Sequence, residues 1–392
     1  MPKDTQLEAL LIGENTCILC SIPLLLSRAG FTVDAISSSR ILRACRSVRS
    51  ISYASSLDKL MQLTRERIRT RNKPYDWVIA ADDGTLKALC TLEWPSGAAP
   101  GFLPVASGGH PGHLYSKIGL SQTLSAGGIQ TPDFRVAQTR EEAVAFASQL
   151  GYPVFAKIDA SGGGGGVFEC RCDSDLKGLK RQFARGPMLI QKKIAGRELD
   201  LSAIYANREL IHFAYSTIDR ALARFGPSVV RTYYPLPLVD PKVFEELAAL
   251  GRVIDAGGFT TISCIEAADG SGRYYIEADM RPNVWTYFPG FYGDDPAPRI
   301  RNWFSTGACL TSDSLQPAAP CVPVTMAYFM RLGWDELLIN RYRVWRHLPP
   351  DGAYLVLRLL LYKFVFDASP LIPEKIRRKL KVMFAVAGLR LT

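Results

Sequence analysis

The feature that most constrains the fold is a short apolar run that ends in a lysine and leads into five consecutive glycines. It reads PVFAKIDASGGGGGV over residues 153–167. The run is typical of a β-strand, and it delivers Lys157 beside a loop without side chains. Lysine meets phosphate oxygens as a point charge, and glycine backbone can close over a polyphosphate and direct N–H groups at it. A flexible linker would be serine-rich with polar flanks, whereas these flanks are apolar, so we predict a nucleoside triphosphate site.

Composition limits the classes of partner. The chain has 392 residues, enough for two or three domains, and its 47% hydrophobic and 21% charged residues are typical of a globular protein. A formal net charge of +10 favours an anionic partner. The basic residues are dispersed and no basic run is interleaved with aromatics, so we expect no nucleic acid. Nucleotide phosphates and an acidic substrate explain the charge equally well.

Cysteines and apolar runs predict the compartment. Nine cysteines form no regular framework, and the charged start MPKDTQLEALLIGENT does not resemble a signal peptide. No stretch approaches the roughly 20 uncharged apolar residues of a membrane span. We therefore expect a cytoplasmic protein. Cys17 and Cys20 form a CxxC in an apolar helix, where core packing is the better interpretation, and four scattered histidines do not make a zinc site.

The first third of the chain predicts a parallel sheet. Strand-like runs at residues 8–12, 31–36 and 76–81 are separated by helical segments, which favours helices on both faces of the sheet. A proline- and glycine-rich stretch at 94–113 marks a domain boundary.

The middle third predicts an α+β domain with a largely antiparallel sheet. Thr139 and Glu142 form a capping box that opens a helix ended by Gly151, and a second helix runs from Asp240 to Gly257. The strand-like runs around them are 188–194, 199–205, 209–216, 262–266 and 273–279.

Residues from about 300 onward are mostly helical in pattern. We therefore predict three domains, at residues 1–112, 113–305 and 306–392. Residues 353–366, AYLVLRLLLYKFVF, are apolar but interrupted by Arg358 and Lys363. We expect a buried helix that packs on the nucleotide domain. With IRRKLK at 376–381, a peripheral membrane contact is the less favoured alternative.

Several charged residues downstream can join the glycine loop. Gln191 and Glu198 lie seven apart in QKKIAGRE, and a hairpin, ISCIEAADGSGRYYIEADMRPN, turns at residues 269–272. This turn would place Glu266 opposite Glu277, and Glu277 and Asp279 share one strand face. Three converging carboxylates need a cation, and oxygen ligands beside phosphates suit Mg²⁺. A solvated acidic face is the alternative for these residues alone.

In combination these motifs resemble the ATP-grasp superfamily, in particular the branch that contains biotin carboxylase and carbamoyl-phosphate synthetase. The resemblance covers residues 8–300. It rests on GYPVFAK with its glycine loop, on Lys117 before a helix and a Gly-Ile-x-x-Pro turn, on IQKKIAGRE and on IEADMRPN. The fold that it implies is a Rossmann-like parallel-sheet domain, then an ATP-grasp domain, then a helical C-terminal segment. Two departures from the family are Ser116 for Asp before the first lysine, and Asp279 for Asn.

The resemblance also implies the roles of individual residues. The resemblance implies that the ATP phosphates are bound by Lys117 and Lys157 and by a mobile lid that contains Gly163, Gly164 and Gly166. The adenine and ribose fall to a hinge segment that contains Gln191, Lys193, Ile194 and Glu198. Mg²⁺ or Mn²⁺ would be bound by Glu266, Glu277 and Asp279. If the register of the hairpin differs, Cys264 takes the place of Glu266. The phosphate-facing catalytic positions are Arg281, on the same strand face if the strand continues, and Asn283.

The reaction that the resemblance implies passes the γ-phosphoryl group of ATP to a carboxylate, after which an amine displaces phosphate to form an amide. We expect a carboxylate–amine ligase with small-molecule acid and amine substrates, and a homodimer as a possible assembly. The alternatives are a bicarbonate-activating carboxylase or carbamoyl-phosphate-type enzyme, and a nucleotide-binding protein without catalysis.

Overall fold

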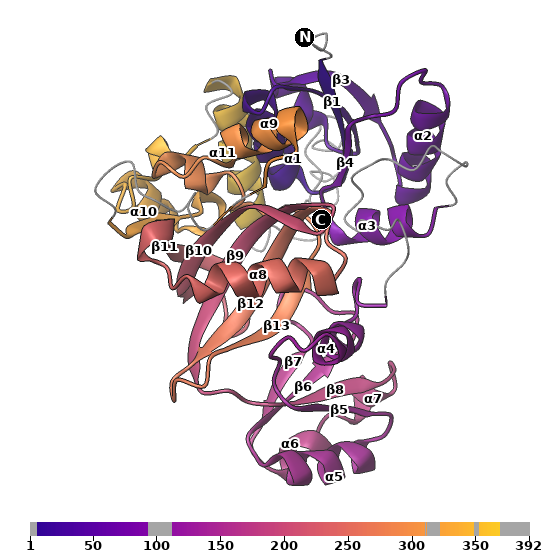
Figure 1. Ribbon diagram of the computed structural model, residues 1–392, viewed down its shortest axis with the longest axis vertical. Coiled ribbons are helices and arrows are strands. Elements are labelled where there is room, and N and C mark those ends of the chain that lie inside the picture. Colours follow the sequence, from indigo (N-terminus) through magenta and orange to yellow (C-terminus); the bar gives the residue numbers. More distant parts are fainter. Residues whose placement is uncertain (1–5, 93–111, 310, 312–321, 349–352, 369–392) are drawn as a thin grey trace. The chain divides into compact units, whose positions relative to one another are not determined.

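The computed structural model describes residues 6–92, 112–309, 311, 322–348 and 353–368 (Figure 1). The chain forms two compact units by its contacts. The N-terminal unit contains residues 1–108, 281–309 and 328–392, and the central unit contains 109–280 and 310–327. This division differs from the three predicted segments, which stay a prediction of domain organisation.

The N-terminal unit contains the predicted parallel sheet. Its strands are β1 (Leu7–Gly13), β2 (Phe31–Ser37), β3 (Val48–Tyr53) and β4 (Trp77–Ala80), in the order β3-β2-β1-β4. Helices α1 (Thr16–Arg28) and α2 (Leu57–Arg69) pack on it, and α3 (Asp83–Cys90) follows β4. Strand β3 was not predicted, because its sequence VRSISY is polar and only half-buried.

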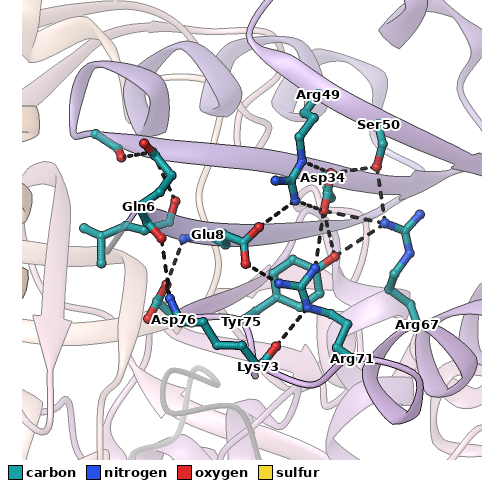
Figure 2. A network of polar contacts seen from close by, with 12 residues as sticks. Gln6, Glu8, Asp34, Arg49, Ser50, Arg67, Arg71, Lys73, Tyr75 and Asp76 are labelled. Atoms are coloured by element: carbon teal, nitrogen blue, oxygen red, sulfur yellow. Dashed lines mark hydrogen bonds and ion pairs between the residues drawn. The ribbon is translucent and has the colours of Figure 1, made fainter. Parts of the chain in front are cut away.

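A polar network lies between α2 and this sheet, and we call it the Asp34 cluster. Figure 2 shows the guanidinium groups of three arginines around Asp34, whose side chain is 1% exposed. Nη2 of Arg49 lies 2.6 Å from an Asp34 carboxylate oxygen, and nitrogens of Arg67 and Arg71 lie at 3.5 and 3.9 Å. The cluster also includes Glu8, Ser50 and Tyr75. It attaches β3 and α2 to the centre of the sheet.

The rest of the N-terminal unit is helical. It contains η1 (Arg40–Ala44), η3 (Phe288–Phe291), α9 (Pro296–Thr306), η5 (Phe329–Arg331), α10 (Trp334–Leu338), η6 (Val344–Arg346) and α11 (Ala353–Ala368). Aromatic rings form its core, with Trp285 and Phe288 centroids 4.7 Å apart and both side chains buried. No helix in the described part of the chain is long and apolar enough to cross a membrane.

The central unit begins with a four-stranded antiparallel sheet in the order β5-β8-β6-β7. Its strands are β5 (Phe134–Ala137), β6 (Val154–Ile158), β7 (Val167–Cys170) and β8 (Met188–Lys192). Its helices are α4 (Lys117–Ala126), α5 (Arg140–Leu150), α6 (Asp173–Lys177) and α7 (Lys180–Phe183). The predicted capping box of Thr139 and Glu142 is present at the start of α5, and Gly151 ends the helix with a positive φ of 82°.

A six-stranded antiparallel sheet completes the central unit, in the order β13-β12-β9-β10-β11-β14. The strands are β9 (Gly196–Ala206), β10 (Glu209–Ala221), β11 (Ser228–Tyr234), β12 (Gly258–Ala267), β13 (Arg273–Asp279) and β14 (Val324–Ala327), and η2 (Leu236–Leu238) follows β11. Helix α8 (Lys242–Val253) ends before Gly257, earlier than predicted. Strands β11 and β14 were not predicted. The fold class is confirmed: a parallel N-terminal sheet, antiparallel sheets and a helical C-terminal region.

Candidate functional site

The predicted lysine and glycine loop lie together in the β6–β7 hairpin. Lys157 on β6 pairs with Val167 on β7, and the glycines connect the two strands. Gly163 and Gly164 have φ of +63° and +78°, which L side chains rarely adopt. A Cβ on Gly164 would lie 1.8 Å from the carbonyl oxygen of Phe225, and one on Gly166 would lie 2.2 Å from Oγ of Ser161. The loop conformation therefore requires glycine at these positions.

Lys157 is a buried cation with a neutral hydrogen-bond partner. Its side chain donates to Oε1 of Gln191 at 2.7 Å, and the residue is 6% exposed. Burial is the largest cause of a lowered pKa at Lys157; Lys117 also lowers it, Glu277 and Glu198 raise it, and the net pKa is about 8. Nε2 of Gln191 is buried without a hydrogen-bond partner among the described residues. An anion beside Lys157 would stabilise the charged form of the lysine and raise its pKa.

Lys117 joins the glycine loop to β13. Its Nζ donates to the carbonyl oxygen of Ser161 and lies 3.8 Å from Oε1 of Glu277. Lys117 starts α4, whose N-cap is Ser116. Asp159, at the end of β6, accepts from Oγ of Ser116 and from the backbone N–H of Ile118, both at 2.9 Å. The ATP-grasp resemblance implies an Asp at position 116, where this chain has Ser116. Asp159 thus supplies a carboxylate beside that position.

The six-stranded sheet presents a polar face opposite α8. Tyr205 contacts α8, because its hydroxyl donates to the carbonyl of Leu247 at 2.9 Å. Side chains alternate along a strand, so the even-numbered residues of β9 (Glu198, Asp200 and Ser202) face away from α8. In the β-sheet register, Ser263 on β12 lies between Asp200 and Glu277. This face therefore brings together acids from β9 and β13.

Two residues of this face were not predicted. Asp200 is buried and forms an ion pair with the buried Arg231 of β11. The alternation of Glu198 and Asp200 is a signal that could have found Asp200. Arg231 could not be found in that way, because β11 was not predicted. The pKa of Glu198 is raised, first by desolvation and then by Asp200 and Glu277, so the acids on this face repel one another.

The predicted register of the β12–β13 hairpin is wrong. The backbone N–H of Ala267 donates to the carbonyl of Gly272 at 2.9 Å, and this tight closure sets Glu266 opposite Arg273. An irregularity at Ser263 and Cys264 then sets Ser263 opposite Glu277. Glu266 lies 2.7 Å from Arg197 and 3.6 Å from Arg273, away from Glu277.

The expected cluster of three carboxylates is therefore not formed. Within the described residues no group of three His, Cys, Asp or Glu side chains could hold a metal ion. Cys264 is buried, and desolvation raises the pKa of its thiol, which makes it a poor metal ligand. Glu277 and Asp279 remain as two oxygen donors on one face of β13.

The other predicted positions have local partners. Nζ of Lys193 lies 3.2 Å from Glu169, and its backbone N–H donates to the carbonyl of Pro153 at 3.2 Å. Ile194 follows β8 and is half-buried.

Arg281 and Asn283 belong to the N-terminal unit. Strand β13 ends at Asp279, so its alternation does not extend to Arg281 as expected. Two guanidinium nitrogens of Arg281 bind the carboxylate of Asp83, one of them at 3.0 Å. Oδ1 of Asn283 accepts from the backbone N–H of Trp285 at 2.8 Å, which stabilises a turn.

Comparison with known proteins finds similarity to part of a carbamoyl phosphate synthase and, in the fold, to synthetase, carboxylase and ligase structures. No protein-family model matches the chain. A stretch of 129 residues is 31% identical to the carbamoyl phosphate synthase large chain of Lachnoclostridium phytofermentans, and it covers 32% of this chain and 12% of that protein. This chain therefore corresponds to a small part of that protein.

Solved structures match over most of the chain. N5-carboxyaminoimidazole synthetase from Staphylococcus aureus superposes with a TM-score of 0.62 at 15% identity, over 86% of this chain and 85% of that one. The biotin carboxylase domain of the Hydrogenobacter thermophilus 2-oxoglutarate carboxylase, in complex with MgADP and bicarbonate, gives 0.58 at 18% identity, over 77% and 70%. The L-amino acid ligase from Bacillus licheniformis gives 0.54 at 16% identity, over 79% and 76%. At these identities the likeness concerns the fold.

Proposed function

We propose that this chain, which has the ATP-grasp fold, is an ATP-dependent ligase that joins a small-molecule carboxylate to an amine and releases ADP and phosphate. The observation that carries the proposal is the environment of Lys157. A buried lysine with a depressed pKa lies beside a glycine loop and interacts with Lys117, Glu277 and Glu198. Perturbed pKa values of this kind are concentrated at functional sites.

The nucleotide would lie between the glycine hairpin and the polar face of the six-stranded sheet, both in the central unit. In this proposal Lys117 and Lys157 contact the phosphates, and Gly163, Gly164 and Gly166 close over them. Gln191, Lys193 and Ile194 line the adenine, for which the buried Nε2 of Gln191 is an available donor. Glu198 accepts hydrogen bonds from the ribose hydroxyls.

Glu277 and Asp279 fit Mg²⁺ or Mn²⁺. Mg²⁺ is usually bound by one or two carboxylates together with substrate phosphates and water, so two acids on one strand face suffice. Glu266, which is engaged with arginines, is not part of this site. A bound Mg²⁺ would neutralise charge on the phosphates.

In this reaction the main role of the protein is to position the nucleotide and the substrates. A carboxylate oxygen attacks the γ-phosphorus, the bond to the β–γ bridging oxygen breaks, and ADP leaves. The amine then attacks the acyl carbon, phosphate leaves, and the amine proton passes to solvent. The lysines stabilise the charge on the transferring group, and the glycine lid excludes water from the acyl phosphate.

A second candidate is a bicarbonate-activating carboxylase. It is favoured by the likeness to an N5-carboxyaminoimidazole synthetase and to a biotin carboxylase domain. Bicarbonate would replace the organic acid, and ADP would again be released. Both candidates use the same phosphate site, so the acceptor distinguishes them.

The test is a matrix of carboxylic acids, with bicarbonate included, against amines, scored by ADP release and product mass. We expect ADP release that requires one acid and one amine, with an amide as the product. Release with bicarbonate as the acid would favour the carboxylase. Stoichiometric AMP would contradict the acyl-phosphate route, and nucleotide binding without turnover in any combination would favour a binding protein. Sedimentation velocity of the same preparation tests the predicted homodimer.

A further inference from the structure

Helix α11 has both buried and exposed apolar side chains among its described residues. Leu355 and Leu359 are buried, and the helix packs against η1. On the other side Leu357, Leu361 and Phe364 are 54%, 47% and 59% exposed. Their i, i+4 and i+7 spacing places them in one stripe. The expectation of a buried helix is thus wrong for these three positions, and the contacts assign α11 to the N-terminal unit.

The stripe continues onto α10. The rings of Trp334 and Phe364 pack edge to face with centroids 6.2 Å apart, which joins the two helices. Leu338 and Ile339 at the end of α10 are 79% and 70% exposed, and Trp345 is 41% exposed. We call these seven side chains the α10–α11 surface: Trp334, Leu338, Ile339, Trp345, Leu357, Leu361 and Phe364. Such a grouping of exposed apolar residues marks an interaction surface.

The charge around this surface is positive. Residues 328–348 and 353–368 contain six Lys and Arg against three Asp and Glu. Arg341, Arg343 and Arg346, which follow α10, are all exposed. The described residues around this surface therefore carry a net positive charge, in a chain whose own net charge is +10.

We propose that the α10–α11 surface binds the face of an anionic phospholipid bilayer. Apolar side chains would enter the interface between headgroups and acyl chains, while the arginines meet lipid phosphates. The two tryptophans suit this place, because an indole ring has an apolar body and a polar N–H. A second copy of this chain is disfavoured as the occupant, because it would bring the same positive charge to the contact.

The experiment is sedimentation of the full chain with vesicles. One set contains phosphatidylcholine alone, and the other contains phosphatidylcholine with about one third phosphatidylglycerol. We expect binding to the anionic vesicles that is released by salt. The triple variant Leu357→Glu, Leu361→Glu, Phe364→Glu should bind at least about tenfold more weakly. Leu238→Glu is the matched control, since Leu238 is 50% exposed in η2 of the central unit, and it should bind as the wild type does.

Three results would overturn the proposal. The first is failure of the wild type to bind, or equal binding to neutral and anionic vesicles. The second is retained binding by the triple variant. The third is a concentration-dependent dimer that Phe364→Glu abolishes in a protein that ignores vesicles, which would make a second copy the occupant. Thermal unfolding and nucleotide titration verify that each variant is folded. If the triple variant does not fold, the lipid and salt series on the wild type still tests the proposal.

Discussion

Two buried charges of opposite sign show how a structural network differs from a binding site. Burial alone would raise the pKa of Asp34, but hydrogen bonds from Arg49, Ser50 and Tyr75 outweigh it and lower the pKa to about 2. Burial lowers the pKa of Lys157 to about 8, and the nearby Glu277 and Glu198 do not offset it. The positive charge around Asp34 more than compensates for the burial of its carboxylate. The negative charge around Lys157 does not compensate for the burial of its ammonium group.

The difference indicates what each region does. A buried charge that is fully hydrogen-bonded and neutralised stabilises the fold without further partners. A buried cation that is under-neutralised is costly in the absence of a ligand and gains most when an anion binds. We therefore assign the Asp34 cluster to structure and the Lys157 site to a polyphosphate. The predictions below test this assignment.

The largest effect is expected at Glu277. Glu277→Gln removes a metal ligand of the proposed site and the acid 3.8 Å from Lys117. We expect ADP release in the presence of the true substrates to fall at least about a hundredfold. Glu266→Gln is the matched control, because Glu266 lies on the neighbouring strand and pairs with arginines, and it should keep most activity. Normal turnover by Glu277→Gln would show that the metal site lies elsewhere.

The next effect concerns stability. Asp34→Asn leaves the arginines of the Asp34 cluster without their central carboxylate, and we expect it to lower the free energy of unfolding by about 3 kcal/mol. Nucleotide affinity at a temperature where the variant is folded should not change. Glu141→Gln removes an exposed pair with Arg140 and should leave stability nearly unchanged, because water screens exposed ion pairs. Urea unfolding measures both, and equal small losses would contradict a structural role for Asp34.

The Asp34 cluster also predicts an acid transition. Because the pKa of Asp34 is lower in the folded state than its ordinary value of 3.8, its contribution to stability is complete above that value. It is lost as the pH falls toward about 2. Wild-type stability should therefore fall over this window, and the fall should be shallower in Asp34→Asn.

Nucleotide affinity should depend on the two lysines. Lys157→Ala and Lys117→Ala each lose a charge-assisted phosphate contact of about 1.5–3 kcal/mol, which is tenfold to a hundredfold or more in the Kd for ATP. Lys59→Ala, on the outer face of α2, is the control and should bind normally. Titration by calorimetry measures all three. Unchanged affinity in both site variants would mean that Lys157 is an ordinary buried strand residue.

Much of this arrangement was predictable because it depends on local sequence. Strand-like runs gave the parallel sheet and most antiparallel strands, and the Thr139–Glu142 capping box and the lysine–glycine hairpin lie where they were expected. Each is determined by residues close together in the chain.

The failures depend on longer-range geometry. The place of Glu266 was set by how tightly the hairpin closes at Ala267 and Gly272 and by an irregularity at Ser263, neither of which the strand pattern encodes. Arg231 was missed because its strand carries polar residues inward. The exposed stripe of α11 was missed because apolar residues occupy most positions of this helix, so the sequence pattern does not reveal which side is covered.

The depressed pKa of Lys157 predicts a pH dependence of binding. A bound polyphosphate favours the charged lysine, so nucleotide affinity should be constant below about pH 8. It should weaken above that value by up to about tenfold per pH unit, because the bound state retains a proton that the unliganded state has lost. Lys157→Arg keeps the charge throughout and should flatten this profile. If wild-type affinity does not change from pH 7 to 10, Lys157 does not lose its proton in this range in the unliganded protein.

The smallest effect is expected at Asp279. Asp279→Asn restores the residue that the ATP-grasp resemblance would have there and keeps one oxygen ligand, so turnover at saturating Mg²⁺ should stay within about fivefold of wild type. The loss of one negative charge should raise the Mg²⁺ concentration needed for half-maximal ADP release. Asp269→Asn changes a carboxylate in the turn of the same hairpin, where it accepts from Ser271, and should leave the Mg²⁺ requirement unchanged. If Asp279→Asn and Asp269→Asn give the same Mg²⁺ curve as wild type, Asp279 does not contact the metal. If Asp279→Asn abolishes turnover at all Mg²⁺ concentrations, the carboxylate has a role that a neutral amide cannot take.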